Sequence, residues 1–306
     1  MSTTPITDER NRSSSARLSS FPQPWMLVII AVVSVQLGAA VAKQLFDAIG
    51  FGGVVFLRTF FGGLIFMLFV RPRLRGYSRR VYGYIVIYGI TITANMLSFY
   101  AAIERIPLGV AVAVAFIGPL GVAVLGSRRA SDLVWVALAA VGILLLSPFT
   151  DVTLDLAGLL LAVVCGLVWG LYIVVTKRVG SLLPGNTMLA LSMCVAALVA
   201  APTGAVSAVG VLASPQLLLT GIVVALLSSV IPFWLEFRAL KSLAPGTFGL
   251  LVSLEPVAAS VMGWLVLHEE LGLTKMVGIG LVTLAAIATA RASSSQSAEL
   301  AVQPQT

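Results

Sequence analysis

Charged residues are scarce in this sequence. They make up 10% of its 306 residues, whereas hydrophobic residues make up 59%, and the mean hydropathy is +1.05. A soluble domain is about 25% charged. A single globule of this length cannot bury so much apolar surface. The composition therefore excludes an ordinary soluble protein and predicts a chain embedded in lipid.

Histidine and cysteine are also rare, which removes several kinds of chemistry. The single histidine, His268, excludes a metal site built from several histidines. The two cysteines, Cys165 and Cys194, lie in apolar runs and have neither disulfide nor metal-binding spacing. The sequence also lacks a phosphate-binding loop and a Ser/His/Asp order typical of a catalytic triad. We therefore expect no metal, no cofactor and no enzymatic activity.

Ten apolar stretches are long enough to cross a bilayer. A hydrocarbon core of about 30 Å requires about 20 helical residues, and short connections rich in Pro, Gly and Ser separate the stretches. The sequence predicts an all-α integral membrane protein with transmembrane spans at 25–45, 51–70, 81–102, 107–126, 132–149, 156–177, 185–204, 216–237, 245–267 and 271–290. The polar segments 1–24 and 291–306 are interpreted as disordered tails.

Basic residues are distributed unequally between the two sides of these spans. If the N-terminal tail is cytoplasmic, the cytoplasmic segments hold 15 of the 19 Lys and Arg residues, as the positive-inside rule requires. Ten spans then place both termini in the cytoplasm, in a multi-pass protein of the inner membrane. The net charge of +7 is explained by attraction to anionic lipid. The basic run 71–80 is interpreted as part of this anchor, and we expect no nucleic-acid partner.

The second half of the chain repeats the first at a shift of 137 residues. At this shift Pro119 aligns with Pro256, and flanking glycines align as well. The repeat unit holds five spans, in residues 25–149 and 156–290. Because five is odd, the second copy enters the membrane from the opposite side. Inverted repeats are typical of alternating-access carriers, whose substrate site lies near mid-membrane between the repeats.

Glu255 is the leading candidate for a functional residue. It precedes Pro256 near the middle of the ninth span, where a carboxylate without a partner costs roughly 2.5–3.5 kcal/mol on insertion scales. Its counterpart in the first repeat is Gly118, so the acid belongs to one half only. We expect it to bind a proton or a substrate ammonium group. The alternative is a structural carboxylate that accepts hydrogen bonds from backbone donors freed by the helix break.

Two other charged residues lie within predicted spans. Arg58, in the second span, could bind a substrate carboxylate in a bidentate manner; it could equally snorkel to the interface or form a structural pair. Glu236 ends the eighth span near the cytoplasmic boundary. It is interpreted as a gate or interface charge, with direct binding of substrate or proton as the alternative.

Uncharged side chains within the spans complete the predicted site, namely Asn95, Trp169 and Tyr172. They could line a cavity, although packing is the commoner role of an aromatic residue in a span. Pro119 and Pro256 are interpreted as matched helix breaks, either kinks that aid packing or hinges on both sides of a central cavity. Gly118 would allow a backbone or a ligand to approach closely.

The segment TFGLLVSLEPVAASVMGWLVLHEEL (247–271), followed by a Gly-rich last span, resembles the C-terminal signature of EamA-type carriers of the drug/metabolite transporter superfamily. The neighbouring ALKSLAPGTFGLLVSLEPV is most similar to the threonine/homoserine exporter branch of Rht type. The resemblance implies ten helices, cytoplasmic termini, a central cavity and export of amino acids or related metabolites, by proton exchange. Glu255 and Pro256 match the family's Glu-Pro pair, and His268 stands where members often have Gly.

These observations leave three functions to compare. In an exporter of small amino acids, Glu255 would hold the substrate's ammonium group and Arg58 its carboxylate. A carrier of the same fold for a purine, a sugar-linked metabolite or a cationic drug is the second possibility, and a cation would not need Arg58. A membrane enzyme or a non-transporting protein is disfavoured, because no catalytic cluster lies near one interface. No domain in the sequence could bind ATP, so we expect a gradient to supply the energy.

Overall fold

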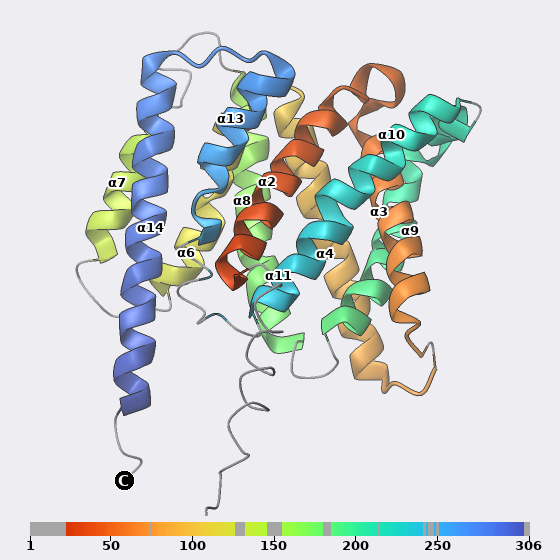
Figure 1. Cartoon of the computed structure of the whole chain (residues 1–306), viewed down its shortest axis with the longest axis horizontal. Coiled ribbons are helices and arrows are strands. Elements are labelled where there is room, and N and C mark those ends of the chain that lie inside the picture. The colour runs from red at the N-terminus through yellow and green to blue at the C-terminus, as the bar shows by residue number, and fades with distance from the viewer. Residues whose placement is uncertain are drawn as a thin grey trace, which may run out of the picture.

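The chain folds into a bundle of helices. The computed structural model describes residues 23–73, 75–125, 132–145, 155–179, 185–212, 214–240, 243, 248 and 251–302, and these residues form no strand. Its helices (Figure 1) are α2 (Pro24–Lys43), α3 (Phe46–Val70), α4 (Arg79–Ile103), α5 (Leu108–Ala115), α6 (Ile117–Leu125), α7 (Asp132–Leu145), α8 (Leu156–Val179), α9 (Gly185–Leu212), α10 (Pro215–Ala225), the π-helix η2 (Leu226–Val230), α11 (Ile231–Leu240), α13 (Glu255–Leu267) and α14 (Leu273–Val302).

Every one of the ten predicted spans contains a helix or a set of consecutive helices, which confirms the all-α membrane fold. Among the described residues, six helices or helix sets are long and apolar enough to cross a membrane by length and composition: α2, α3, α4, α8, α9 and the α10–α11 set. The apolar helices of the fourth, ninth and tenth spans are shorter, at Leu108–Val122, Glu255–Leu267 and Leu273–Ala288.

The fourth and ninth spans are both interrupted, and the interruptions correspond in the two repeats. α5 ends before Phe116, and α6 begins directly after it. In the ninth span a turn at Ser253 and Leu254 precedes α13. Pro119 and Pro256 each lie in the first turn of the helix that follows, where the missing N–H has no intrahelical acceptor to lose. The prolines therefore begin new helices rather than bend continuous ones.

A third irregularity lies in the eighth span, where the π-helix η2 separates α10 from α11. Pro232, just after η2, has no N–H to donate to the carbonyls of Leu227 and Ser228 one turn earlier. Other helices supply the missing donors. Ser34 Oγ donates to the Leu227 carbonyl at 2.7 Å, and Arg58 Nη2 donates to the Ser228 carbonyl. No pattern in the sequence predicted this π-helix.

The longest extensions beyond the predicted spans are at the ends of α9 and α14. α9 continues to Leu212, past position 204, and contains Pro202. α14 continues to Val302, so residues 291–302 are helical where the sequence predicted a disordered tail. These residues are Ala, Ser, Gln, Glu, Leu, Val and one Arg, with no Gly or Pro to end the helix. The predicted N-terminal tail lies outside the described residues, apart from Gln23 and Pro24.

Each of the main contacts between helices has a counterpart in which every helix is replaced by the matching helix of the other repeat. α3 packs against α9, and α7 against α14, so the second span meets the seventh and the fifth meets the tenth. α2 packs against α11 and α13, just as α8 packs against α4, α5 and α6. Two five-helix repeats related by a twofold axis produce this pairing.

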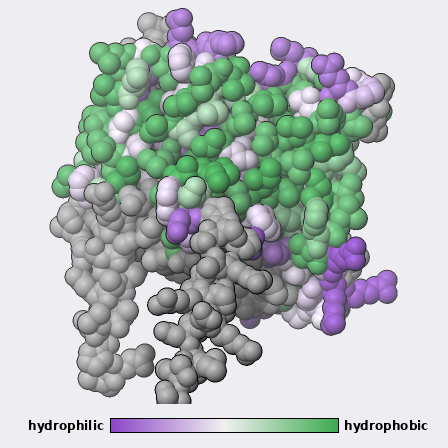
Figure 2. All heavy atoms as spheres, viewed as in Figure 1, coloured by the Kyte–Doolittle hydropathy of each residue, from purple (hydrophilic) through white to green (hydrophobic). Residues whose placement is uncertain are grey.

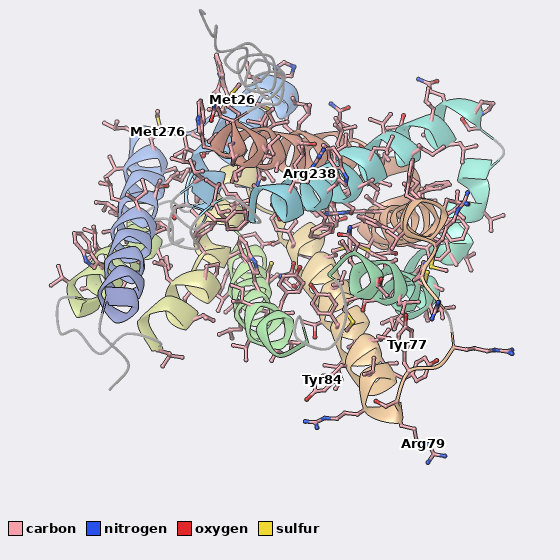
Figure 3. All side chains as sticks on the ribbon, turned by 60° about the horizontal axis from the view of Figure 1, so that its bottom comes forward. Met26, Tyr77, Arg79, Tyr84, Arg238 and Met276 are labelled. Atoms are coloured by element: carbon pink, nitrogen blue, oxygen red, sulfur yellow. The ribbon has the colours of Figure 1, made fainter. Side chains whose placement is uncertain are left out.

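The outer surface of the bundle matches a bilayer. Large apolar side chains are exposed all along the spans, including Leu64, Phe69, Ile87, Leu198 and Trp264. Hydrophobic residues cover the middle of the face in Figure 2, and hydrophilic residues gather at its upper and lower edges. Arg79, at the start of α4, points away from the helices (Figure 3). So much contiguous apolar surface indicates contact with lipid.

Candidate functional site

A cavity of about 560 Å³ lies inside the bundle. Its walls come from the middle parts of α2, α3, α4 and α8, from the break between α5 and α6, from η2 and α11, and from the beginning of α13. The lining is mostly apolar, with a small number of polar and charged side chains. This size and composition are typical of a small-molecule site.

Most of the residues predicted from the sequence line this cavity, although they come from six different spans: Arg58, Asn95, Pro119, Trp169, Tyr172, Glu236 and Glu255. Gly118 and Pro256 do not line it. A Cβ added to Gly118 would lie 2.0 Å from the carbonyl oxygen of Gly166. The close approach expected at Gly118 is therefore to the backbone of α8, not to the cavity.

Arg58 is held in place by neutral groups. Its side chain is buried, with 8% exposed. Nε donates to Ser229 Oγ at 2.9 Å, Nη1 donates to the Tyr100 hydroxyl at 3.0 Å, and Nη2 donates to the Ser228 carbonyl. The side chain thus neither snorkels nor pairs with an acid among the described residues. Three of its five N–H groups are used, and its positive charge stays at the cavity wall.

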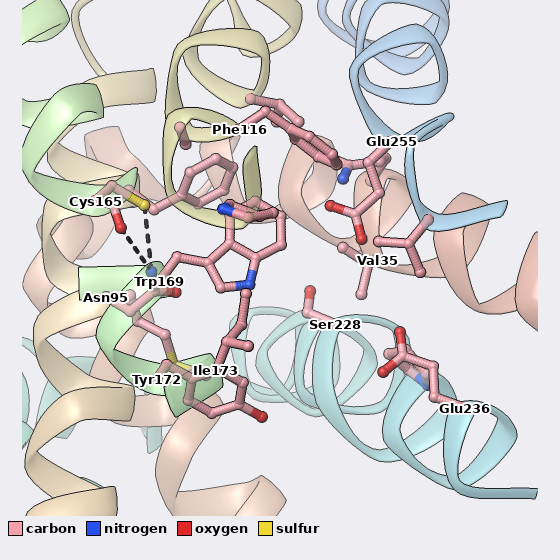
Figure 4. A pocket seen from close by; sticks show the side chains of 18 of the residues that line it. Val35, Asn95, Phe116, Cys165, Trp169, Tyr172, Ile173, Ser228, Glu236 and Glu255 are labelled. Atoms are coloured by element: carbon pink, nitrogen blue, oxygen red, sulfur yellow. Dashed lines mark hydrogen bonds between the residues drawn. The ribbon is translucent and has the colours of Figure 1, made fainter. Parts of the chain in front are cut away.

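Two carboxylates point into the same cavity (Figure 4). Glu255 is the first residue of α13, and Glu236 lies on α11. Both line the cavity. Within the described part of the chain neither carboxylate forms a salt bridge.

Aromatic side chains form one wall of the cavity. Tyr172 on α8 stacks on Tyr88 of α4 with ring centroids 5.1 Å apart, and their hydroxyls are hydrogen-bonded at 2.9 Å. Trp169 meets Phe116 edge-on at 5.2 Å. Phe116 is the residue at the α5–α6 break, so the break presents an aromatic ring to the cavity. This contribution was missed in the sequence, where Phe116 is one apolar residue among many.

Asn95 has a structural contact beside its place in the cavity wall. Its Nδ2 donates to the carbonyl of Cys165 at 3.2 Å and contacts Cys165 Sγ at 3.4 Å (Figure 4). These bonds join α4 to α8 and fix the amide at the cavity edge.

Among the polar residues of the cavity, Gln36 and Ser228 were not identified from the sequence. Gln36 on α2 is 2% exposed and Ser228 in η2 is 1% exposed, and both line the cavity. Gln36 could have been found as an amide inside an apolar span. Ser228 carries a weaker signal, because a serine in a membrane helix commonly bonds its own backbone.

Charged contacts join several helices at the end of the bundle where α13 leads to α14. Lys43 Nζ, at the end of α2, lies 2.6 Å from Glu269 Oε1. Glu269 Oε2 accepts a hydrogen bond from the backbone N–H of Leu108, the first residue of α5, at 2.9 Å. At the same end Arg105 and Asp155 pair at 3.0 Å. The hydrogen bond from Arg105 lowers the pKa of Asp155 from its ordinary value.

Comparison with known proteins identifies the family. Residues 156–291 match the EamA-like transporter family. The threonine/homoserine exporter RhtA of Escherichia coli (strain K12) is 37% identical over 266 residues, which are 86% of this chain and 90% of the exporter. Its counterpart in Salmonella typhimurium (strain LT2) is 38% identical over 269 residues, 87% of this chain and 89% of that protein.

The chain belongs to the EamA-like transporter family. This EamA-type carrier falls in the Rht branch of the drug/metabolite transporter superfamily, as the resemblance in its ninth span predicted, and it is a multi-pass membrane transporter rather than an enzyme. A solved crystal structure with 16% sequence identity covers 89% of this chain and 98% of its own, with a TM-score of 0.56. At that identity it shows a shared fold only.

Proposed function

We propose that this EamA-type carrier exports small amino acids of the threonine and homoserine kind across the inner membrane, by alternating access and in exchange for protons. The observation that carries the proposal is that one cavity, built from the middles of the spans, holds Arg58, Glu236 and Glu255 together. The names of the relatives, which are 37% to 38% identical over most of the chain, supply the substrate class.

The charges of the cavity fit a zwitterion. A substrate carboxylate can accept hydrogen bonds from the two N–H groups of Arg58 that remain unused, and a charge-assisted bond of this kind is among the strong ones. A substrate ammonium group needs an anion, and Glu255 and Glu236 both face the cavity. A carrier of simple cations would need the two acids but would have no use for the arginine.

The same charges support proton exchange. With both acids ionised, Arg58, Glu236 and Glu255 together carry one negative charge, and the uptake of one proton makes the set neutral. A zwitterion adds no net charge, so its binding does not replace that proton by charge alone. It does compete for a carboxylate, because the ammonium group and the proton bind the same oxygen atoms. Competition for one acid is a sufficient basis for antiport.

Alternating access requires a closure that can open at each side. We interpret the contacts of Glu269 as the closure of the outer side, because they tie the end of α2 and the beginning of α5 to the end of α13. The excess of Lys and Arg on the opposite side supports cytoplasmic termini. Opening to the outside would then break the Lys43–Glu269 pair, at a place where water can solvate both ions.

Counterflow in proteoliposomes tests the function. Vesicles loaded with unlabelled threonine should accumulate labelled threonine and homoserine, and an imposed pH gradient should drive net flux. Glu255→Gln should retain exchange at a reduced rate and lose the response to pH. Glu270→Gln is the matched control, because Glu270 is exposed and does not line the cavity. If the wild-type protein carries neither amino acid, the substrate class is wrong. If the Glu255 variant still responds to the gradient, this residue is not the proton site.

A further inference from the structure

Two residues that line the cavity each carry a buried polar side-chain atom that has no hydrogen-bond partner among the described residues. The atoms are Gln36 Oε1 and Ser228 Oγ, on side chains that are 2% and 1% exposed. No other buried side-chain nitrogen or oxygen in that part of the chain lacks a partner. Buried polar groups are nearly always satisfied, and exceptions call for an explanation. Both exceptions line the same cavity.

We propose that Gln36 Oε1 accepts a hydrogen bond from the side-chain hydroxyl of the transported amino acid, and that Ser228 Oγ donates to its carboxylate beside Arg58. This inference rests on the proposed function, since it assigns atoms within the substrate site of an amino-acid exporter. It makes Gln36 the residue that selects a hydroxylated side chain, and Ser228 a residue that binds the part common to all amino acids.

The assignment of Ser228 follows from its neighbours. Arg58 Nη2 donates to the Ser228 carbonyl, and Arg58 Nε donates to the adjacent Ser229 hydroxyl. The guanidinium is therefore next to the residue that carries the unpartnered hydroxyl. Ser228 Oγ also points into the pocket in Figure 4. A carboxylate that binds the free N–H groups of Arg58 meets a hydroxyl donor there, and acceptor-only oxygens require such donors.

Gln36 is assigned to the substrate group that the charged residues of the cavity do not bind. An ammonium group binds most strongly to a carboxylate, and the cavity provides Glu236 and Glu255. A substrate carboxylate cannot donate to an amide oxygen. The substrate group that remains for Gln36 Oε1 is a neutral donor, and the hydroxyl of threonine or homoserine is one. A site that hydrogen-bonds a substrate hydroxyl discriminates strongly against the analogue without it, because its own polar atom is then left unpaired.

Pairs of nearly isosteric amino acids test the proposal. Threonine and valine have nearly the same shape, but threonine carries a hydroxyl where valine carries a methyl group. In the wild-type protein threonine should compete with labelled threonine roughly tenfold or more better than valine does. Gln36→Met keeps the volume and removes the polar atoms. It should reduce that preference to about twofold or less, mainly by lowering the affinity for threonine.

Two variants serve as comparisons. Ser228→Ala should lower the affinities for threonine and valine to the same degree, so that the ratio of the two affinities stays at the wild-type value. Ser34→Ala is the matched control on α2, because Ser34 is buried but donates to the Leu227 carbonyl and does not line the cavity. It should leave the threonine-to-valine ratio unchanged.

The outcomes separate the inference from the proposed function. A wild-type protein that carries no amino acid overturns both. A wild-type protein that carries threonine and valine equally well overturns the hydroxyl site alone, whether or not the variants fold. A threonine preference that persists in Gln36→Met has the same consequence. A ratio that changes in Ser228→Ala as much as in Gln36→Met would overturn the division of roles between the two residues.

Discussion

Replacement of Arg58 by methionine separates a structural role of this residue from a role in binding. The side chain donates three hydrogen bonds to groups of α4 and η2. At the average of about 0.6 kcal/mol measured for polar contacts between membrane helices, their loss costs about 2 kcal/mol. Removal of an arginine from mid-membrane returns up to roughly 2.5–3.5 kcal/mol on insertion scales. The two terms nearly cancel, so Arg58→Met should fold with a free energy of unfolding within about 2 kcal/mol of the wild type.

Transport should respond very differently. A charge-assisted hydrogen bond to a substrate carboxylate contributes about 1.5–3 kcal/mol. Each 1.4 kcal/mol is a factor of ten, so apparent affinity for threonine should fall roughly 10- to 100-fold. The informative competitor is threoninol, the amino alcohol without the carboxylate. Counterflow should show that the wild-type protein prefers threonine to threoninol and that Arg58→Met does not.

Tyr100→Phe is the matched control for this experiment. It removes one of the three acceptors of Arg58 and keeps the charge, and threonine affinity should change by no more than about threefold. The binding role of Arg58 is refuted if Arg58→Met prefers threonine to threoninol by the wild-type margin. A Tyr100 variant as defective as the Arg58 variant would show that the position of the Arg58 side chain, and not its charge alone, limits transport.

Three further results are expected. Gly118→Ala should destabilise the protein by about 1–3 kcal/mol, seen as a lower melting temperature in detergent, because the new Cβ would lie 2.0 Å from a backbone oxygen of α8. Gly121→Ala on the same helix is the control: its new Cβ would meet no atom within 4 Å, and the melting temperature should not change. Glu269→Gln should increase the labelling of a cysteine introduced at the cavity by an impermeant thiol reagent applied from outside, and unchanged labelling would mean that the Lys43 pair does not close that side. Asp155→Asn should lower the melting temperature slightly at neutral pH and by less as the pH falls below the ordinary value of 3.8, because a carboxylate with a lowered pKa stabilises the folded state above its unfolded pKa and loses that contribution as the pH falls through its folded pKa; an effect that does not shrink at acid pH would contradict this reason.

The comparison of sequence and structure shows which inferences had a local physical cause. Glu255 could be found because a charge inside an apolar span is expensive wherever the span packs. Arg58 was found for the same reason, but its three neutral partners come from helices 42 to 171 positions away in the sequence. Phe116 and Ser228 could not be found, since their importance comes from a helix break and a π-helix that place them at the cavity.

The amino-acid sequence by itself indicated the lipid solvent, the helical class and the charged candidates, and it predicted ten spans in two repeats. All of these follow from hydropathy, from the high cost of charge in lipid, and from a shift that aligns Pro119 with Pro256. Only the tertiary structure decided that residues from six spans face one cavity and that Arg58 is bonded to η2. Tertiary structure alone also left Gln36 and Ser228 each with an unpartnered atom. The reason is that lipid selects for apolar residues at nearly every position of a span, so the residue type says little about which face of a helix meets protein, lipid or cavity.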